Sequence, residues 1–555
     1  MIRMWRRLSY QEVPALSVRR GHLRRALRTV TLAWAFGVAW LAASSGSHLR
    51  ILAGQLGFGD LAFGVLAAIP FMATFGQVFA AALIERTGLV KYQFIHFAAV
   101  HRGLWLVVAM LPLVLPVPSD VAVVAVLGAV AASWFMAALS APAWMTWMGM
   151  LIPRRLRGRY FAQRERIALM IQVPIVLAIG ASVDILFPAS DDTRTGLGLS
   201  VICGILAAGS LLGVVDILLF RRVPELVAPP HPPSGSEPAR AQGLLTPPVP
   251  QVRAPNLRAF LIRYLHEPMR DPAFRSYALF GATMTFSMTV AGWFFWLNAM
   301  DHLRFGGLGA NLLFLVVGPA AGIWSSRWWG RAIDRWGRRP ILFVGTVGAV
   351  LCVIPWLVLT PDMTGPPILS DIHRWVLSLA EGAFGRQASG DPGQPAAVGA
   401  YVIAAMACAF GGAAWTGVNL AQIGIVLGFA DGNGRSRYVA ASSVLISAGG
   451  VIGGVSGGVL AESLRHLQDV PLQRGPLLWN NWHIAFLVAA FARCLALLWL
   501  IRMPDPGAAK IRAVTRHMGV NAYNALLTRL FYPVRVFGWS VRKRRPKSGH
   551  NPQNS

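Results

Sequence analysis

The chain has 555 residues, of which 55 % are hydrophobic and 13 % are charged, and its mean hydropathy is +0.52. This is more apolar surface than the core of a soluble protein needs, so composition excludes a soluble globular protein and predicts an all-α membrane protein. The net charge of +28 would suggest nucleic acid as a partner in a soluble chain. Here the basic residues gather in tails and loops between apolar segments, so we expect contacts with anionic lipid headgroups and no nucleic acid.

Apolar segments long enough to cross a bilayer as helices recur along the whole chain, each near the ~20 residues that span a ~30 Å hydrocarbon core. We expect twelve transmembrane helices, over residues 27–47, 61–84, 93–116, 120–147, 165–187, 196–220, 275–299, 310–329, 340–360, 397–428, 437–461 and 482–503.

The distribution of arginine and lysine orients these helices. If the N-terminus is inside, the ends of the even-numbered helices face the cytoplasm and carry nearly all of the basic residues, as the positive-inside rule requires. Both termini are therefore expected in the cytoplasm. Arginine-rich, lysine-poor usage is consistent with a GC-rich bacterial genome, which makes the bacterial cytoplasmic (inner) membrane the expected location of a multi-pass protein.

The first parts of the chain in sequence order are a basic cytoplasmic tail, residues 1–26, and a first group of six helices, residues 27–220. The first apolar run is too long for the core of a signal peptide and is expected to remain as helix 1. Between helices 2 and 3 lies a short polar turn that contains Glu85, Arg86, Gly88 and Lys91. We refer to residues 81–91 as the first turn.

The next parts are a linker, a second group of six helices and a second tail. The linker, residues 221–274, is rich in proline and is expected to be flexible or extended in the cytoplasm. Six helices follow in residues 275–503, and residues 361–396 among them are rich in proline and glycine, which suggests an insertion on the outer face. The basic tail 504–555 is expected in the cytoplasm, with either an interfacial amphipathic helix or a solvated segment near its middle.

The turn between the eighth and ninth helices reads Gly330-Arg331-Ala332-Ile333-Asp334-Arg335-Trp336-Gly337-Arg338-Arg339-Pro340. Its pattern, G-x3-D-R-x-G-R-R, resembles the signature loop of the major facilitator superfamily, which joins the second and third helices of each six-helix half. We refer to residues 330–339 as the signature turn. The resemblance covers roughly residues 27–503 and implies a transporter with twelve helices in two pseudo-symmetric bundles.

A repeat within the chain supports this architecture. Glu85 of the first turn and Asp334 of the signature turn are 249 residues apart, and Arg157 and Arg435, which begin similar basic segments, are 278 residues apart. One duplication followed by an insertion of about 29 residues in the second half explains both spacings. The insertion coincides with the segment 361–396.

The resemblance also implies roles for the two turns. In the family, the acid of the signature loop holds the cytoplasmic ends of neighbouring helices together in the outward-facing state, and arginines complete the charge network. The residues that match this cytoplasmic gate are Gly330, Asp334, Arg335, Gly337, Arg338 and Arg339, with Glu85, Arg86, Gly88 and Lys91 in the first turn. Because Leu89 and Val90 replace two basic positions of the first turn, we expect a weaker contact there.

In the family, the first and fourth helices of each half line a central substrate cavity. Hydroxyl, amide and aromatic side chains dominate these helices here, which suits a neutral or amphipathic solute, although such residues also serve in helix contacts and at interfaces. The candidate cavity residues are Ser44, Ser45, Trp134, Trp144, Thr285, Thr289, Trp293, Trp415, Asn419 and Gln422.

Ionisable groups inside the predicted helices are few. Arg102, Asp184, Asp216 and Arg493 are candidates because a charge within a membrane needs a partner or water. Structural pairing is favoured over a proton relay, since the helices that carry Arg102, Asp216 and Arg493 are peripheral in the family. No carboxylate lies near the middle of helices 1, 4, 7 and 10, so uniport and antiport both remain open.

Other function classes fit the sequence less well. No lysine follows a glycine as a nucleotide-binding P-loop requires, and the cysteines show no metal-binding spacing, so neither a cofactor nor a metal site is expected. Gly57-Phe58-Gly59-Asp60 resembles the G-x-G-D motif of intramembrane aspartyl proteases, but its partner motif is absent, and we expect no enzyme. The sequence favours a monomeric permease for a small solute. A non-transporting relative that acts as a receptor or assembly factor is the alternative.

Overall fold

The computed structural model of the protein describes residues 20–87, 89–187, 196–224, 267–361, 363, 398–429, 435–474, 477–504 and 508–530. Most of the linker and of the insertion, both ends of the chain and Gly88 lie outside these residues, as do the side chains of Glu85 and Arg86. The expectations for those segments are therefore not addressed below.

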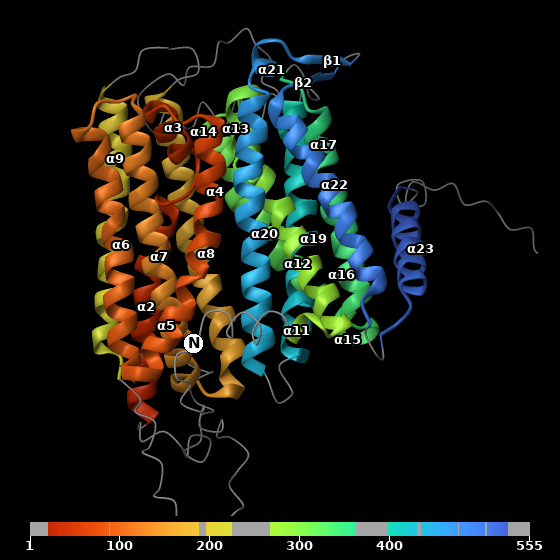
Figure 1. Ribbon diagram of the computed structural model, residues 1–555, viewed down its shortest axis with the longest axis horizontal. Coiled ribbons are helices and arrows are strands. Elements are labelled where there is room, and N and C mark those ends of the chain that lie inside the picture. The colour runs from red at the N-terminus through yellow and green to blue at the C-terminus, as the bar shows by residue number, and fades with distance from the viewer. Residues whose placement is uncertain are drawn as a thin grey trace, which may run out of the picture.

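The described helices form two bundles that follow one another in the sequence (Figure 1). The first bundle, residues 20–222, consists of α2 (Arg20–Ala43), α3 (Ser47–Leu56), α4 (Asp60–Thr74), α5 (Gly76–Thr87), α6 (Val90–Val114), α7 (Asp120–Leu151), α8 (Arg154–Leu186), α9 (Gly196–Leu219) and a 3-10 turn, Phe220–Arg222.

The second bundle, residues 267–502, begins with α11 (Glu267–Met269), α12 (Pro272–Ala291), α13 (Phe294–Leu297) and a π-helical turn, Asn298–His302. It continues with α14 (Gly307–Asn311), a π-helical stretch, Leu312–Val317, and then α15 (Gly318–Trp336), α16 (Arg338–Leu351), α17 (Ile354–Val358), α19 (Val398–Phe429), α20 (Arg435–Ser463), α21 (His466–Asp469) and α22 (Asn481–Arg502). A hairpin of β1 (Leu472–Arg474) and antiparallel β2 (Leu477–Trp479) precedes α22, and α23 (Ile511–Leu530) follows it.

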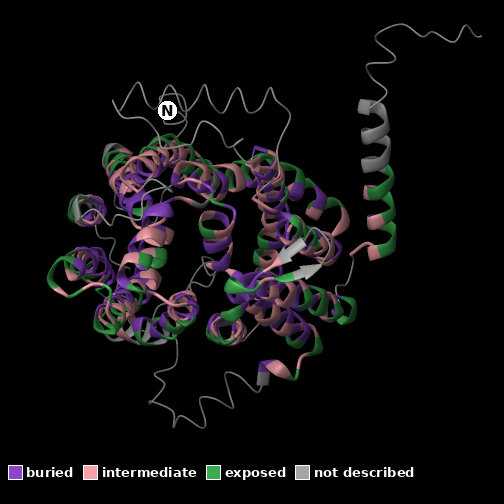
Figure 2. Cartoon of the chain, turned by 90° about the horizontal axis from the view of Figure 1, so that it is seen from above, coloured by how far each residue is buried: buried purple, intermediate pink, exposed green. Residues whose placement is uncertain are grey.

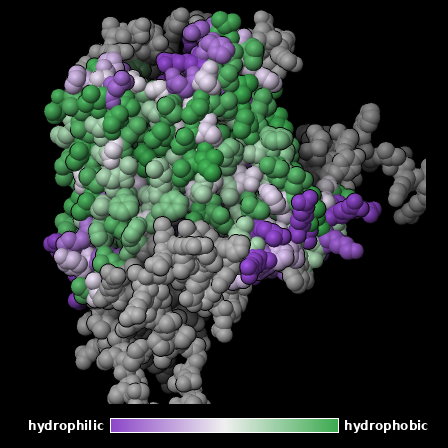
Figure 3. Space-filling model, in the orientation of Figure 1, coloured by the Kyte–Doolittle hydropathy of each residue, from purple (hydrophilic) through white to green (hydrophobic). Residues whose placement is uncertain are grey.

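The number of membrane crossings agrees with the sequence. Eleven helices among the described residues are long and apolar enough to span a bilayer, and the shorter apolar helix Asp60–Thr74, extended by α5, supplies a twelfth. A broad band of hydrophobic residues covers the visible face of the molecule, with hydrophilic residues above and below it (Figure 3). The predicted all-α membrane fold with twelve helices in two bundles is confirmed.

Two helix boundaries differ from the prediction in ways that matter for function. The first helix ends at Ala43, and α3 starts after a break at Gly46, where φ is 121°. The fifth helix begins at Arg154 instead of residue 165, directly after Pro153. Hydropathy missed this segment because its first turns are basic, yet arginine and leucine are good helix formers.

The two ends of the bundle differ in charge. We term the end at which Arg222, Arg339 and Arg502 lie the basic end, and the end that carries Asp60 and Asp301 the opposite end. Beside the second bundle stands α23, clearly separate from the other helices in the view from above (Figure 2). Its first turns contact the second bundle, since Val514 is buried in a small cluster with Trp329.

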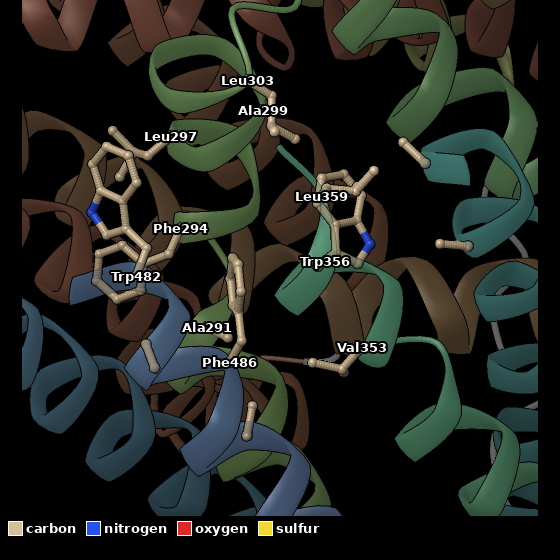
Figure 4. Packing of buried hydrophobic residues seen from close by; sticks show 14 of the residues in the cluster. Ala291, Phe294, Leu297, Ala299, Leu303, Val353, Trp356, Leu359, Trp482 and Phe486 are labelled. Carbon is tan, nitrogen blue, oxygen red and sulfur yellow. The ribbon is translucent and has the colours of Figure 1, made fainter. Parts of the chain in front are cut away.

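Hydrophobic contacts join the two bundles at the opposite end. One cluster combines Ala53 and Phe63 of the first bundle with residues of the second such as Phe294, Trp482 and Phe486. Figure 4 shows the second-bundle part of this cluster, in which side chains from several helices meet. The clusters at the basic end of the described chain each draw their residues from one bundle alone.

Within the second bundle, α15 and α19 cross at close range through glycine. A Cβ atom added at Gly412 would lie 2.0 Å from the carbonyl oxygen of Gly318. By contrast, a Cβ added at Gly204 on α9 meets nothing within 4 Å.

Gly412→Ala is therefore expected to lower the thermal unfolding temperature of the detergent-purified protein, because overpacking of this kind costs about 1–3 kcal/mol. Gly204→Ala serves as the matched control and is expected to leave that temperature unchanged or slightly raised, since alanine favours helix over glycine by about 1 kcal/mol. Equal unfolding temperatures in the two variants would contradict the close crossing.

Candidate functional site

The first polar contact between the bundles at the opposite end centres on Asp184. This residue lies near the end of α8, and its carboxylate accepts hydrogen bonds from the backbone N–H groups of Gly307 and Leu308, the latter at 2.9 Å. These N–H groups begin the eighth membrane helix, where the helix leaves its first donors unsatisfied and carries a partial positive charge. The contact thus fixes the fifth helix to the eighth.

Asn311 extends this contact one turn further. Its side-chain oxygen accepts from the backbone N–H of Ser47 at 2.8 Å, and its side-chain nitrogen donates to the carbonyl of Val176 at 2.7 Å. Asn311 and Ser47 are both fully buried. One amide therefore links three helical segments, from α3, α8 and α14, and leaves both of its ends hydrogen-bonded.

The second polar contact centres on Asp60, at the start of α4. Its carboxylate accepts from the side chains of Asn481 at 2.7 Å, Trp482 at 3.0 Å and Gln468 at 3.2 Å, all in the second bundle. Asp60 is 7 % exposed. Asp60, the acid of the G-x-G-D sequence, is therefore a structural link between the two bundles.

An ion pair and a contact between aromatic rings also join the two bundles at the opposite end. Arg50 Nε donates to the carboxylate of Asp301 at 3.0 Å, which ties α3 to the end of the seventh helix. Beside it, the rings of Phe63 and Trp293 lie 5.7 Å apart between centroids. Trp293, predicted to line the cavity, is thus part of this contact between the bundles.

The signature turn at the basic end is shaped by Gly337 and Arg339. Gly337 adopts φ of 89°, a left-handed conformation that favours glycine. Arg339 donates to the carbonyls of Leu500 at 2.9 Å and Ile501 at 2.6 Å, so its guanidinium caps the last turn of α22. A cation is favourable there because the C-terminus of a helix carries partial negative charge. The backbone N–H of Ala509 donates to the Trp336 carbonyl at 2.9 Å, which holds the segment before α23 against the turn.

The remaining residues of the signature turn form no hydrogen bond or ion pair with the first bundle among the described residues. Asp334, Arg335 and Arg338 are exposed. Within the part of the chain that the structure describes, Asp334 has no ion pair. Gly330 is not required for space, since a Cβ added there meets nothing within 4 Å.

Lys91 of the first turn has the same function as Arg339. Its ammonium donates to the carbonyls of Arg221 at 3.0 Å and Val223 at 2.8 Å, at the end of the sixth helix. In each half, a basic residue at the start of the third helix therefore caps the end of the sixth. The lysine is displaced by one position relative to Arg339, which hid the equivalence in the sequence.

Most of the predicted cavity residues on helices 1 and 7 bond within their own helix or at its end. Ser44 and Ser45 both donate to the carbonyl of Leu41, at 3.3 and 2.6 Å. Thr289 is buried, donates to the carbonyl of Thr285 at 3.0 Å and contacts the eleventh helix. These hydrogen bonds and contacts therefore have a structural role within and between the helices.

The predicted residues on helices 4 and 10 are more open. Trp134 is 39 % exposed and lies 6.3 Å from the ring of His101. Asn419 is exposed and Gln422 is half-buried. Of the predicted cavity residues, Trp144 and Trp415 each lie beside a charged side chain, which in both cases is an arginine.

The arginine beside Trp144 is Arg164, which the sequence placed in a loop. Its guanidinium carbon lies 4.6 Å from the ring centroid of Trp34, 5.1 Å from that of Phe161 and 5.5 Å from that of Trp144. The three rings come from α2, α8 and α7. The signal that would have found Arg164 is the buried stripe Tyr160, Arg164 and Ala168, spaced as one face of a helix.

Two further arginines are buried within the bundles. Arg102 donates to the carboxylate of Asp216 at 3.3 Å and lies 3.5 Å from the ring centroid of Trp40. Arg493 donates to the carbonyl of Ala349 and to the hydroxyl of Ser287 at 3.3 Å, and lies 5.4 Å from the ring centroid of Trp415. The expected structural pairing of Arg102 and Asp216 is thus present.

One protein family has a model that matches more than half of the chain. The family model of the Major Facilitator Superfamily matches residues 29–389. No curated protein matches the chain. The described residues contain no cluster of histidine, cysteine and acidic side chains that would hold a metal.

Several solved transporters are similar in structure. A mutant form of the nucleoside transporter NupG has a TM-score of 0.54 at 11 % identity and covers 87 % of this chain and 100 % of its own. The xylose transporter XylE from E. coli, in a partially occluded inward-open conformation, has a TM-score of 0.53 at 10 % identity and covers 88 % and 100 %. A bacterial homologue of the iron transporter ferroportin, in an inward-facing state, has 0.52 at 12 % and covers 86 % and 98 %. At such identities the likeness shows the fold alone.

Asp184→Asn is expected to weaken the contact between the bundles at the opposite end, because a neutral amide accepts weaker hydrogen bonds than a carboxylate. Loss of about 1.4 kcal/mol would raise about tenfold the fraction of molecules in which the bundles are apart at this end. The measurement is the alkylation rate of Ser47→Cys in a background without native cysteines, since Ser47 is fully buried when the bundles touch.

Asp120→Asn provides the control for this experiment, because Asp120 is an exposed acid in the first turn of α7 at the same end. Its alkylation rate is expected to match that of the parent. Equal rates in the Asp184 and Asp120 variants would show that the Asp184 carboxylate does not hold the bundles together.

Proposed function

The chain belongs to the Major Facilitator Superfamily and is a secondary transporter, and from this premise we propose that it moves a small solute across the bacterial cytoplasmic membrane by rocking its two bundles about a central site. The division into bundles at residues 27–220 and 275–503, joined by a cytoplasmic linker, is part of the proposal. So is a monomer as the working unit.

The orientation follows from charge. The basic end, with Arg222, Arg339 and Arg502, would face the cytoplasm, and the tails 1–26 and 504–555 would lie on the same side. Their arginines and lysines would then meet anionic headgroups, each with about 1 kcal/mol of attraction near the surface. Asp60, Asp184 and Asp301 would face the outside.

The observation that carries the proposal is the position of the contacts between the bundles. The hydrogen bonds of Asp184, Asn311 and Asp60, the Arg50–Asp301 pair and the shared apolar cluster all lie at the opposite end. At the basic end, the described apolar clusters stay within one bundle. This arrangement supports an inward-facing state, in which a solute would reach the central site from the cytoplasm.

The exposed signature turn fits that state. The gate formed by Gly330, Asp334, Arg335, Gly337, Arg338 and Arg339, with Glu85, Arg86, Gly88 and Lys91 in the other half, would close only when the transporter faces outward. Arg339 and Lys91 already serve a separate purpose, since both cap the sixth helix of their half. Asp334, Arg335 and Arg338 are exposed and left available for a contact across the gate.

Of the predicted cavity residues, Trp144 and Trp415 are best supported, because each stands beside a buried arginine. Thr285, Asn419, Gln422 and Trp134 remain candidates for the lining. Ser44, Ser45, Thr289 and Trp293 are better explained by helix ends and contacts between helices.

Distance measurements between spin labels test the rocking motion. One pair, Ala162→Cys with Arg331→Cys, reports on the basic ends of α8 and α15, and a second pair, Val121→Cys with Val358→Cys, reports on the opposite end. A thermal-shift screen of sugars, amino acids, organic anions, nucleosides, siderophores and lipids first identifies a ligand, because a ligand of the folded state raises the unfolding temperature. The ligand is expected to shift the two distance distributions in opposite senses. Distributions that do not change with any ligand that binds would contradict alternating access.

Asp334→Asn is expected to slow turnover more than it weakens solute binding, because the carboxylate would act only in the outward-facing state. Removal of one charge-assisted contact of about 1–2 kcal/mol predicts a decrease of roughly tenfold in flux into proteoliposomes. The unfolding temperature of the inward-facing protein should stay the same. Asp469→Asn, an exposed acid at the opposite end, is the control, and equal flux in the two variants would exclude a gating role for Asp334.

A further inference from the structure

Arg164 is a buried charge whose hydrogen-bonding capacity the fold uses only in part. It is 9 % exposed, and its Nε atom is buried without a hydrogen-bond partner. Its hydrogen-bonded ionic partner is the adjacent Glu165, with 2.9 Å between Arg164 Nη2 and Glu165 Oε1, and the buried carboxylate of Asp216 also attracts its charge. Arginine has five N–H donors, so most of its hydrogen-bonding capacity is not used by this contact.

Four charged residues of the first bundle are buried: Asp60, Arg102, Arg164 and Asp216. Of the two acids, Asp60 accepts from donors of the second bundle and Asp216 is hydrogen-bonded to Arg102. In the second bundle, Arg493 is bonded to neutral groups, a carbonyl and a hydroxyl. A charge within a membrane protein is costly unless it is paired or hydrated, and among these four residues of the first bundle Arg164 is the one whose hydrogen-bonded partner, Glu165, is exposed.

The surroundings of Arg164 suit the recognition of a ligand. Three aromatic rings from three helices, Trp34, Phe161 and Trp144, surround the guanidinium at 4.6 to 5.5 Å. Cation–π contacts of this kind contribute about 0.5–2 kcal/mol and orient the planar group. The rings leave the edge of the guanidinium as the part that can bind an oxyanion through two parallel hydrogen bonds.

Glu165 shows where this edge can be reached. Its side chain is 53 % exposed, and it lies five residues into the apolar part of α8, which begins at Tyr160 near the basic end. An exposed carboxylate in this part of the helix is expected to face a water-filled space and not lipid. An anion arriving through this space would meet the same edge of Arg164 that Glu165 now occupies.

We infer that Arg164, with Trp34, Phe161 and Trp144, binds the anionic group of the transported solute, and that the solute is an organic anion whose carboxylate or phosphate displaces Glu165 from the guanidinium. The rings then contact the apolar or aromatic body of the solute. This inference rests on the proposed transport function and changes the solute class expected from helices 1, 4, 7 and 10, which lack this charge.

Binding of matched probes to the full-length purified protein tests the inference. Each pair has one apolar body with and without the charge: 2-naphthoate with 2-naphthamide, and phenyl phosphate with phenol. Affinities are measured by thermal shift and by tryptophan fluorescence. The anions are expected to bind at least tenfold more tightly than their neutral counterparts.

Three variants separate a binding role from a structural one. Arg164→Met should weaken anion binding at least tenfold and leave 2-naphthamide binding unchanged. Glu165→Gln should tighten anion binding severalfold, because the competing carboxylate is gone, and a purely structural ion pair would not give this gain. Arg166→Met, an exposed arginine two positions further along α8, should leave all affinities unchanged.

The outcomes distinguish this inference from the proposed function. If a neutral solute binds and shifts the spin-label distances while Arg164→Met and Glu165→Gln alter no affinity, the chain transports but Arg164 does not select anions. If Arg164→Met fails to fold, the Glu165→Gln result decides, and an unchanged or lower anion affinity would overturn the inference. If anions bind as expected but no distance shifts, the anion site stands and the rocking motion does not.

Discussion

A charged group inside the hydrocarbon layer must find its partner within the protein, and the positions of the charged side chains in this chain follow from that constraint. Asp184 and Asp60 meet it with donors from the other bundle, so the same bonds that satisfy them also join the two halves. Arg102 and Asp216 meet it within one bundle. The first type of pair has to break when the bundles move, whereas the second type can persist through the whole cycle.

Contacts within one bundle have a structural role in this pseudo-symmetric protein, whereas contacts between the bundles have to change during transport. Lys91 and Arg339 cap the sixth helix of their own half, and Arg102 and Arg493 bind within theirs. Such contacts stabilise each bundle and do not have to break when the bundles move relative to each other. Contacts between bundles involve different residues in the two halves: Asp60 and Asp184 of the first half accept from donors of the second, whereas Asp301 of the second half accepts from Arg50 of the first.

The fold was largely predictable from the sequence because hydropathy and positive charge are local signals. Helix count, the two halves and the signature turn followed from segment length and from the order of Gly330, Asp334 and Arg338. Boundaries failed where polar residues begin a helix, as at Arg154, because hydropathy does not detect a basic first turn. The equivalence of Lys91 with Arg339 depends on where a long side chain reaches and not on its place in an alignment.

The candidate site was less predictable for a related reason. Helical serines and threonines look like cavity residues in a sequence, yet a hydroxyl can bond to its own helix, as Ser45 and Thr289 do. Arg164 was missed because its partners, Trp34 and Trp144, are over a hundred and about twenty residues away and come together only through tertiary structure. A residue in a membrane protein is therefore better judged by whether its bonding capacity is used than by its type. By that measure Asp60 and Asp184 have found their partners, whereas Arg102 and Arg164 both keep buried nitrogens without a hydrogen bond. Arg164, whose hydrogen-bonded ionic partner is an exposed neighbour, has capacity left for a solute.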